Sequence, residues 1–564
     1  MRLIDYAVVI LVLLFAMALR ISGTATFGAL DEQNLPSSAP YDMLHIQAPL
    51  QPDEYLLVAL PYDMTLKQRS NPQFFEYPSG IMYLNYVLYQ MTGTLDGVTL
   101  ADRDGVNLRT IAPFSLYFFS RLYSVLAGVI AVACAYGILR RVSGRFAALM
   151  AALLLATSFI LVQHAHYIKP GTPSAGLMML ALWASVMALY SRKLQSTYSF
   201  YIASGMLTGA AATVRYNAAA IGIVLFLVGL ILLWRQRTKQ MFISIIASWL
   251  LVPVTFFIGT PFAILDFNEF YRQFVAITGQ FLSSGNNIAP EILTTPQHGF
   301  MILMRFLIVF GTSIPATIAI PIGIFGAWRE RPKQLLKDNS EHLLIGLLVL
   351  FIVAYIFVTM RTVRPIFSDN LIVLIVPQCL LLSAIGAGWL YDNIRVPKTV
   401  LAPLIACGLL IMPLALTIPM VSLISQTETR VRMQEWVYEH IPLGSRFLLL
   451  EAYNVPLDPT IYPYDQNFNI RGFRLSDAEN YDYLLISDAR LDLYARADVL
   501  VTDEEFAPYQ SQLTLIEANF PRLAWIDRPR DYLGYADMMN MAAYWHQPSL
   551  TLYCLNETAC ATRP

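Results

Sequence analysis

The sequence predicts a polytopic α-helical membrane protein of about eleven transmembrane helices, followed by an extracytoplasmic α/β domain. Three observations support this prediction. Apolar runs of about twenty residues recur from Ile4 to about Ser422, Lys and Arg gather in alternate turns, and the last 140 or so residues mix helix-like and strand-like patterns. Hydrophobic residues make up 56% of the 564 and the mean hydropathy is +0.52. The net charge of −1 argues against a nucleic-acid partner.

The predicted spans define the transmembrane part, residues 1–425. They lie near residues 4–22, 112–138, 146–164, 173–191, 200–215, 217–234, 241–263, 301–327, 342–359, 371–391 and 399–422. The fifth and sixth are the hardest to separate. The Lys and Arg residues of the short connections fall on one predicted side of the membrane. They are Arg2, Arg140, Arg141, Arg145, Arg192, Lys193, Arg235, Arg237, Lys239, Arg329, Arg331, Lys333, Lys337, Arg395 and Lys398.

Basic turns stay in the cytoplasm, so this pattern predicts a multi-pass inner-membrane protein with a cytoplasmic N-terminus and an outer C-terminal domain. The first run also resembles a signal peptide because it is short and follows Arg2. However, no small-x-small cleavage site follows Arg20, and the charge alternation needs this span.

Two long outer connections are expected within the transmembrane part. The first, residues 23–113, carries the acidic pairs Asp31-Glu32 and Asp53-Glu54, and its stretch Tyr77–Tyr89 has the spacing of an amphipathic helix lying in the membrane interface. The second, residues 265–300, is long enough to be a functional lid, although a plain surface excursion fits equally well.

The outer domain, residues 426–564, is predicted to be a small α/β unit. Met433, Trp436, Val437 and Ile441 form one helix face, which Pro442-Leu443-Gly444 ends, and strand-like runs follow. Cys554 and Cys560 are expected to form a disulfide, with free thiols as the alternative. The other cysteines, Cys134, Cys379 and Cys407, lie in apolar runs and are interpreted as packing residues.

Basic and aromatic residues fall on the same predicted side as the acidic pairs. Lys169 follows His164, His166 and Tyr167, and Arg215-Tyr216 ends the fifth span. Membrane-edge cations need a partner, and an anionic lipid phosphate is one. Each feature also has a plain explanation: Asp53-Glu54 as a solvated loop, Arg215 snorkelling to lipid head groups. A helix would turn His164 and His166 to nearly opposite sides, which argues against a shared zinc.

Several motifs resemble bacterial membrane glycosyltransferases of the dolichyl-phosphate-mannose protein mannosyltransferase type, which have the GT-C fold and form glycosyltransferase family 39. The motifs are Pro52-Asp53-Glu54, Asn71-Pro72-Gln73-Phe74-Phe75-Glu76-Tyr77-Pro78, Arg121-Leu122-Tyr123-Ser124, the basic turn at 140–145, His164-Ala165-His166-Tyr167, the stretch 211–217 and Thr260-Pro261-Phe262. The likeness covers about the first 400 residues and is looser beyond them, where 433–444 resembles the family's W-I-x-x-x-I-P-x-G segment.

The resemblance implies an inverting glycosyltransferase of the cell envelope that moves a hexosyl or pentosyl group from a polyprenyl-phosphate carrier to an acceptor hydroxyl on a protein, lipid or polysaccharide. Asp53 would be the general base and Glu54 would position the acceptor or the loop. Lys169 and Arg215 would neutralise the departing phosphate. The other expected substrate-binding residues are His166, Tyr167, Tyr216, Glu76, Tyr77 and Arg121. Arg121 equally fits a structural pairing with an outer carboxylate.

Two departures from the family pattern stand out. Gly171 lies where relatives usually carry an acidic residue, and Asp369-Asn370 where they often show Arg-Tyr. Asp31-Glu32 is a rival for the base. No cofactor is firmly predicted; relatives differ in needing a divalent metal, so the metal stays open. The alternatives to an enzyme are a lipid or sugar transporter or flippase, and a catalytically inactive assembly subunit of the same fold.

Overall fold

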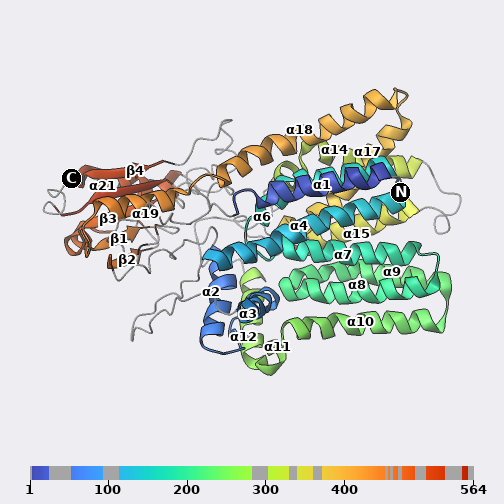
Figure 1. The fold of residues 1–564 in the computed structure, drawn as a ribbon, viewed down its shortest axis with the longest axis horizontal. Coiled ribbons are helices and arrows are strands. Elements are labelled where there is room, and N and C mark those ends of the chain that lie inside the picture. Colours follow the sequence, from blue (N-terminus) through green and yellow to red (C-terminus); the bar gives the residue numbers. More distant parts are fainter. Residues whose placement is uncertain are drawn as a thin grey trace.

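The computed structural model describes residues 3–24, 52–92, 114–282, 303–329, 340–359, 371–450, 455, 457, 461–467, 470, 473–488, 503–527 and 549–556. These residues form a long bundle of helices and a smaller α/β unit at one end of it (Figure 1). The N-terminus lies at the opposite end of the bundle. The turns near residues 140–145, 191–193, 235–239 and 394–398, which carry predicted cytoplasmic charges, share that end (Figure 1).

Helices along the bundle coincide with all eleven predicted spans. They are α1 (Leu3–Ile21), α4 (Phe114–Val142), α5 (Arg145–Thr157), α6 (Phe159–Ala165), α7 (Gly171–Tyr190), α8 (Leu194–Val214), η3 (Tyr216–Ile221), α9 (Gly222–Gln236), α10 (Lys239–Gly259), η4 (Phe306–Thr312), α14 (Ile314–Arg329), α15 (Ser340–Thr359), α17 (Val376–Asn393) and α18 (Lys398–Ile424). Within the described ranges six helices are long and apolar enough to cross a membrane, or eight if each bent pair is one span. Three of the predicted spans are not among these eight; they coincide with α1, α8 and α17. The chain is therefore a multi-pass, mostly helical membrane protein.

Two predicted spans are broken, which the sequence analysis did not anticipate. The first bends by 54° between α5 and α6. The carbonyl groups freed at the end of α5 find new donors: Arg20 donates to Leu155 O at 2.8 Å and Ala156 O at 3.0 Å, and Thr417 donates to Thr157 O at 2.8 Å. Arg20 is 1% exposed. Its guanidinium thus replaces the missing helical hydrogen bonds, because a carbonyl group without a hydrogen-bond donor inside the membrane is costly in free energy.

The second break, between η4 and α14, has a local cause. Pro315 has no N–H and cannot donate to Gly311 O four residues earlier, as a continuous helix would require. The chain bends by 94° at this point, and Ser313 takes a left-handed backbone with φ 73°. Gly311 O instead accepts a hydrogen bond from Ser158 Oγ at 2.7 Å. Ser158 is the residue at the first break, so the two broken spans are joined to each other.

Substitution of Arg20 tests this role. Arg20→Met removes the bonds to Leu155 O and Ala156 O and is expected to lower the free energy of unfolding by at least about 1–3 kcal/mol. Thermal unfolding of the purified protein in detergent measures the loss, and Arg20→Lys should be intermediate because it keeps the charge with fewer donors. The matched control is Ser22→Ala, which loses only an exposed bond within its own helix. Equal stability of Arg20→Met and Ser22→Ala would contradict the proposed role.

Four helices lie at the end of the bundle that faces the α/β unit. They are α2 (Pro52–Leu66), α3 (Gly80–Thr92), α11 (Phe262–Leu265) and α12 (Phe267–Leu282). Helices α2 and α12 run across the long axis of the bundle (Figure 1). The predicted helix at Tyr77–Tyr89 therefore exists, beginning three residues later. The start of α3 packs against the end of α8, since a Cβ on Gly80 would lie 2.6 Å from Thr213 O.

The α/β unit contains a five-stranded sheet between helices. Its elements are α19 (Thr429–His440), β1 (Phe447–Leu450), β2 (Tyr464–Asn467), η7 (Leu475–Asn480), β3 (Tyr483–Ser487), α21 (Asp503–Asn519), β4 (Arg522–Ile526) and β5 (Leu550–Cys554). The strand order is β2-β1-β3-β5-β4, with β1 parallel to β2 and β3, and β5 antiparallel to β3 and β4. Alternate residues of β1 face opposite cores: Phe447 and Leu449 pack with α19, whereas Leu448 and Leu450 pack with Ile516 of α21. The predicted α/β architecture is confirmed; the boundary near residue 425 and the outer location stay predictions.

The predicted packing role fits Cys134 and Cys379 but not Cys407, which lies on the exposed side of α18. Cys134, Cys379 and Cys407 are free; the first two are buried and Cys407 is exposed. Cys554 is disulfide-bonded. Its expected partner Cys560 lies outside the described residues, so the pairing itself stays a prediction.

Candidate active site

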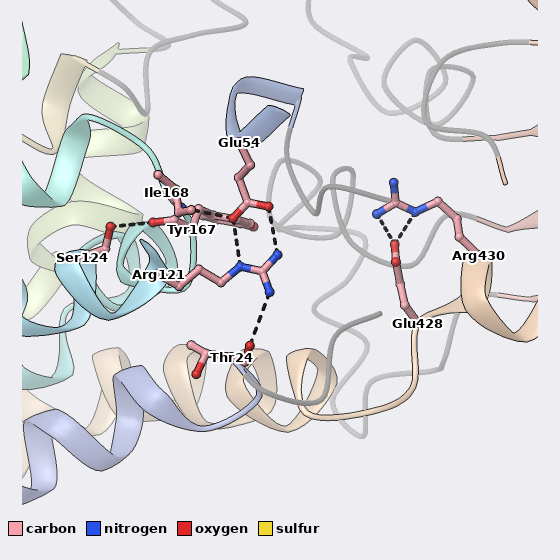
Figure 2. Close-up of polar contacts among 8 residues, drawn as sticks. All are labelled: Thr24, Glu54, Arg121, Ser124, Tyr167, Ile168, Glu428 and Arg430. Atoms are coloured by element: carbon pink, nitrogen blue, oxygen red, sulfur yellow. Dashed lines mark hydrogen bonds and ion pairs between the residues drawn. The ribbon is translucent and has the colours of Figure 1, made fainter. Parts of the chain in front are cut away.

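The acidic pair of the first outer connection lies in the first turn of α2. The Glu54 side chain is fully buried and pairs with Arg121 of α4, which is 1% exposed. Arg121 Nε donates to Glu54 Oε1 and Nη2 donates to Oε2, both at 3.0 Å (Figure 2). Two parallel hydrogen bonds are the geometry in which a guanidinium best compensates a buried carboxylate. Of the two interpretations of Arg121, the structure shows the structural pairing, with the Glu54 carboxylate as the partner.

Further hydrogen bonds join this ion pair to other segments. Glu54 Oε1 also accepts the N–H of Ile168 at 3.1 Å, and Arg121 Nη1 donates to Thr24 O at 3.3 Å. One turn after Arg121, Ser124 donates its hydroxyl to Tyr167 O at 2.6 Å. The chain that follows α1, the start of α2, helix α4 and the segment after α6 therefore meet around one carboxylate (Figure 2). Anchoring Glu54 fixes the backbone of the adjacent Asp53; the Asp53 side chain lies outside the described set.

The segment that follows α6 buries several candidate residues. His166 is fully buried, Tyr167 is 2% exposed and Lys169 is 3% exposed. The ring nitrogens of His166 lie 2.8 Å from Val162 O and 2.9 Å from Ser22 O, so the ring bridges α6 and the end of α1. A buried ammonium such as that of Lys169 needs compensating polar or anionic groups. The backbone of this segment is tied to Glu54 through the N–H of Ile168.

The glycine at position 171 has a steric explanation. A Cβ on Gly171 would lie 2.9 Å from His164 Nδ1 and 3.1 Å from Val373 Cγ1. The His164 ring, itself buried, occupies space beside the first turn of α7. An acidic side chain at 171 would therefore collide with His164 and Val373. The second departure from the family pattern, Asp369-Asn370, lies outside the described residues.

Arg215 marks the end of α8, where the backbone becomes extended (φ −153°, ψ 125°). The next residue, Tyr216, donates its hydroxyl to Phe75 O at 2.9 Å. Asn217 Nδ2 then donates to Tyr355 Oη at 3.1 Å, and Tyr355 donates to Leu371 O at 3.1 Å. Arg215 is partly exposed and lies close enough to Tyr355 to interact with it electrostatically. The residues that follow Arg215 are thus fixed by hydrogen bonds to the loop 71–77 and to α15.

The loop between α2 and α3, which carries Glu76 and Tyr77, is clamped by α12. Gln273 Oε1 accepts the N–H of Phe75 at 2.6 Å, and Gln273 Nε2 donates to Gln73 O at 3.0 Å. The Phe75 ring also packs edge-on against Phe270, at 5.8 Å between centroids. Glu76 is exposed and Tyr77 is partly buried. The part of the second outer connection that the structure describes therefore holds the first.

Two more contacts support this clamp. Asn71 Nδ2 donates to Asp266 Oδ2 at 2.8 Å. Gln273 Nε2 also donates to Glu269 Oε1, which pairs with Arg272. The bonds from Arg272 and Gln273 lower the pKa of Glu269 to about 2. The Glu269 carboxylate therefore stays ionised throughout the neutral and mildly acidic range.

Among the described residues, no group of three or more His, Cys, Asp or Glu side chains could hold a metal ion. His164 lies in the last turn of α6 and His166 follows the helix, bonded to backbone carbonyls.

Comparison with known proteins supports this architecture. The family described as dolichyl-phosphate-mannose-protein mannosyltransferase matches residues 115–265. ArnT from Cupriavidus metallidurans in the apo state is similar, with 13% identity, a TM-score of 0.50, and 92% of this chain and 96% of that one covered. The same protein bound to undecaprenyl phosphate gives 12% identity, a TM-score of 0.51, and coverage of 99% of this chain and 98% of that one. The chain has the GT-C fold. No curated protein matches the sequence significantly.

Within this GT-C fold, sequence reasoning missed the residues that hold the outer loops together. Gln273 and Asp266 lie in the second outer connection, which the sequence left as either a lid or a surface excursion. A signal was present: Phe267, Phe270, Tyr271 and Phe274 have helical spacing on both sides of Glu269 and Arg272. Arg20 and Pro315 likewise signalled the broken spans, since a membrane cation and a proline each need a structural reason.

Loss of the Gln273 carboxamide should weaken the attachment of the loop between α2 and α3. Gln273→Ala frees Phe75 N and Gln73 O, so we expect the free energy of unfolding to fall by about 1–3 kcal/mol. Thermal unfolding of the purified protein in detergent measures this change. The control is Arg272→Ala on the neighbouring position, whose side chain bonds only to Glu269 within α12 among the described contacts. An equal effect of both variants would assign the loss to α12 in general and not to the clamp.

Proposed function

We propose that this protein is an inverting glycosyltransferase that moves a sugar from a polyprenyl-phosphate carrier to an acceptor hydroxyl at the outer face of the membrane. The GT-C fold is the observation that carries the proposal, together with the buried Glu54–Arg121 pair that fixes the start of α2. ArnT has been solved with undecaprenyl phosphate, a lipid of the proposed carrier class. The hexosyl or pentosyl identity of the sugar is left open.

The proposed reaction is one displacement at the anomeric carbon. Asp53 accepts the proton of the acceptor hydroxyl while the new C–O bond forms. The bond between the anomeric carbon and the phosphate oxygen breaks, and its electron pair leaves with the polyprenyl phosphate. Attack opposite the leaving group inverts the anomeric configuration. General-base assistance of this kind contributes about 10²–10⁴-fold.

Glu54 and Arg121 serve this reaction by position. The Glu54 carboxylate and the Arg121 guanidinium bond to each other. Glu54 also accepts the N–H of Ile168, and Arg121 also donates to Thr24 O. Both Glu54 oxygens already accept hydrogen bonds from Arg121, and Oε1 accepts another from Ile168 N, so this carboxylate is poorly placed to contact an acceptor hydroxyl. Glu54 therefore holds the α2 backbone, which agrees with the loop-positioning role expected for it, and Asp53 is assigned as the base.

Lys169 and Arg215 are proposed to meet the phosphate. Lys169 follows Ile168, whose N–H is bonded to Glu54, so its backbone is tied to the α2 anchor. Arg215 is partly exposed and lies at the end of a helix that α3 contacts. Cations stabilise the developing phosphate charge without reorganising. Tyr216, Tyr77, Glu76, Tyr167 and His166 are proposed to shape the site around them.

A transporter is the alternative function that broken spans indicate, because transporters often use free carbonyl groups at helix breaks as ion ligands. In this protein, hydrogen-bond donors of its own side chains bond to those carbonyl groups. Arg20 and Thr417 bond the end of α5, and Ser158 bonds Gly311 O. These carbonyl groups already accept hydrogen bonds and are not left free to bind an ion. This favours a structural role for the helix breaks and supports the proposal of an enzyme. We also propose that the N-terminus is cytoplasmic and the α/β unit extracytoplasmic in the inner membrane.

The deciding experiment is incubation of the purified protein with polyprenyl-phosphate sugars and candidate acceptors. Release of free polyprenyl phosphate, followed by mass spectrometry, is the expected result for an enzyme. Addition of a chelator in the same assay tests a divalent metal. Absence of release from every hexosyl and pentosyl carrier, with folded protein, would favour the inactive assembly subunit. Mass spectrometry of envelope glycans with and without the gene would identify donor and acceptor.

A further inference from the structure

Helix α12 has two different apolar faces. Phe270 and Phe274 face inward: the Tyr216 ring packs edge-on against them, with centroids 6.4 Å and 5.2 Å away. Phe267, Tyr271 and Val275, spaced four residues apart, share another face and are 57%, 57% and 47% exposed. We call these three residues the outer stripe. Inward packing explains the first face, and nothing in the described part of the chain covers the second.

The outer stripe is continuous with a lipid-facing surface. Helix α10, which is long and apolar enough to span the membrane, is mostly unburied by the rest of the protein. Its exposed residues include Leu250, Val254 and Ile258, and the exposed surface continues through Ile264 and Leu265 of α11. A span with this much apolar exposure must contact lipid tails. The stripe on α12 begins two residues after Leu265, where the chain turns across the bundle axis (Figure 1).

We propose that α12 is anchored in the outer leaflet of the membrane, with the outer stripe resting on phospholipid at the boundary between head groups and acyl chains. Its crosswise direction, aromatic stripe and charged flank of Glu269 and Arg272 are those of an interfacial helix. A tyrosine suits this depth because its ring is apolar and its hydroxyl is polar. A protein partner would have to cover the lipid-facing side of α10 as well, which favours lipid.

Gln273 of α12 and Asp266 of the segment before it bind the loop at residues 71–77. The lipid contact of α12 therefore also fixes the distance of that loop from the membrane surface. A substrate carried on a membrane lipid approaches from that same surface. Helix α12 thus links the position of the lipid surface to the loop next to α2. This inference concerns the helix and its lipid contact and does not depend on the reaction proposed above.

Spin labelling in lipid nanodiscs tests the anchor. Labels are attached to Tyr271→Cys and Val275→Cys, with Arg272→Cys as the matched control. The background is Cys407→Ser, which removes the exposed free cysteine of the described residues. Arg272 is adjacent and at least as exposed, with a side-chain exposure of 69%, but it lies on the charged flank. Power saturation compares collisions with oxygen, which enters lipid, and with a nickel chelate, which stays in water.

We expect labels at 271 and 275 to collide severalfold more with oxygen relative to nickel than the label at 272 does. Equal access of all three labels to the nickel chelate would overturn the proposal. Dipolar broadening between labels at 271 on two copies of the chain would also overturn it, since the stripe would then be a protein interface. Because the readout needs no turnover, failure of the proposed enzymatic function would not affect this result.

Discussion

Asp53→Asn is expected to reduce sugar transfer by about 10²–10⁴-fold, because the amide cannot accept the acceptor's proton as the new bond forms. The substitution is nearly isosteric, and the fold depends on the adjacent Glu54, so the thermal unfolding midpoint in detergent should stay close to that of the wild type. Release of polyprenyl phosphate, measured at saturating and limiting donor, separates kcat from KM. The main effect should be on kcat, since a base acts on the transition state.

The rival base supplies the control for this experiment. Asp31→Asn changes the other acidic pair of the first outer connection, which lies outside the described residues, and should keep nearly full activity. Full activity of Asp53→Asn together with loss in Asp31→Asn would transfer the role of base to Asp31. Loss of activity in Asp53→Asn with a collapsed unfolding midpoint would instead make Asp53 structural.

Arg121→Met is expected to lower the free energy of unfolding by about 3–5 kcal/mol, because it leaves Glu54 charged and fully buried without its partner. Activity should fall with stability, since the start of α2 loses its anchor. Fluorescence-detected thermal unfolding in detergent and carrier release measure the two losses on the same preparation.

A double-variant cycle separates the ion pair from simple loss of packing. Glu54→Gln removes the negative charge and keeps the acceptor for Ile168 N. The double variant Glu54→Gln with Arg121→Met should therefore be more stable than Arg121→Met alone, because no charge is left uncompensated. Simple additivity of the two single changes would show that the pair carries no interaction energy. Recovery of stability without recovery of activity would show that α2 needs this particular anchor for function.

Much of the fold followed from local patterns. Runs of apolar residues can satisfy their backbone in a membrane only as helices, so the helices along the bundle could be placed from the sequence. Apolar runs of strand length at 446–450 and 481–486 indicated β1 and β3, whereas β2, β4 and β5 were not predicted. The breaks within two spans were missed, although Pro315 indicated one of them. The break at Ser158 has no proline or glycine beside it, and Arg20, Thr417 and Ser158 form their bonds at helix ends far apart in the sequence.

The candidate site likewise has one part that the sequence determined and another that only the tertiary structure decided. The sequence by itself identified the chemically capable residues, Asp53, Glu54, Arg121, Lys169 and Arg215, because charged groups are rare and costly beside a membrane. Only the tertiary structure decided that Glu54 and Arg121 satisfy each other, 67 positions apart, and that Gln273 holds Phe75, 198 positions away. Residue type and spacing determine which charges a chain must compensate. Partners are chosen by packing, since a buried hydrogen bond depends on angles and distances that are fixed only when the helices come together.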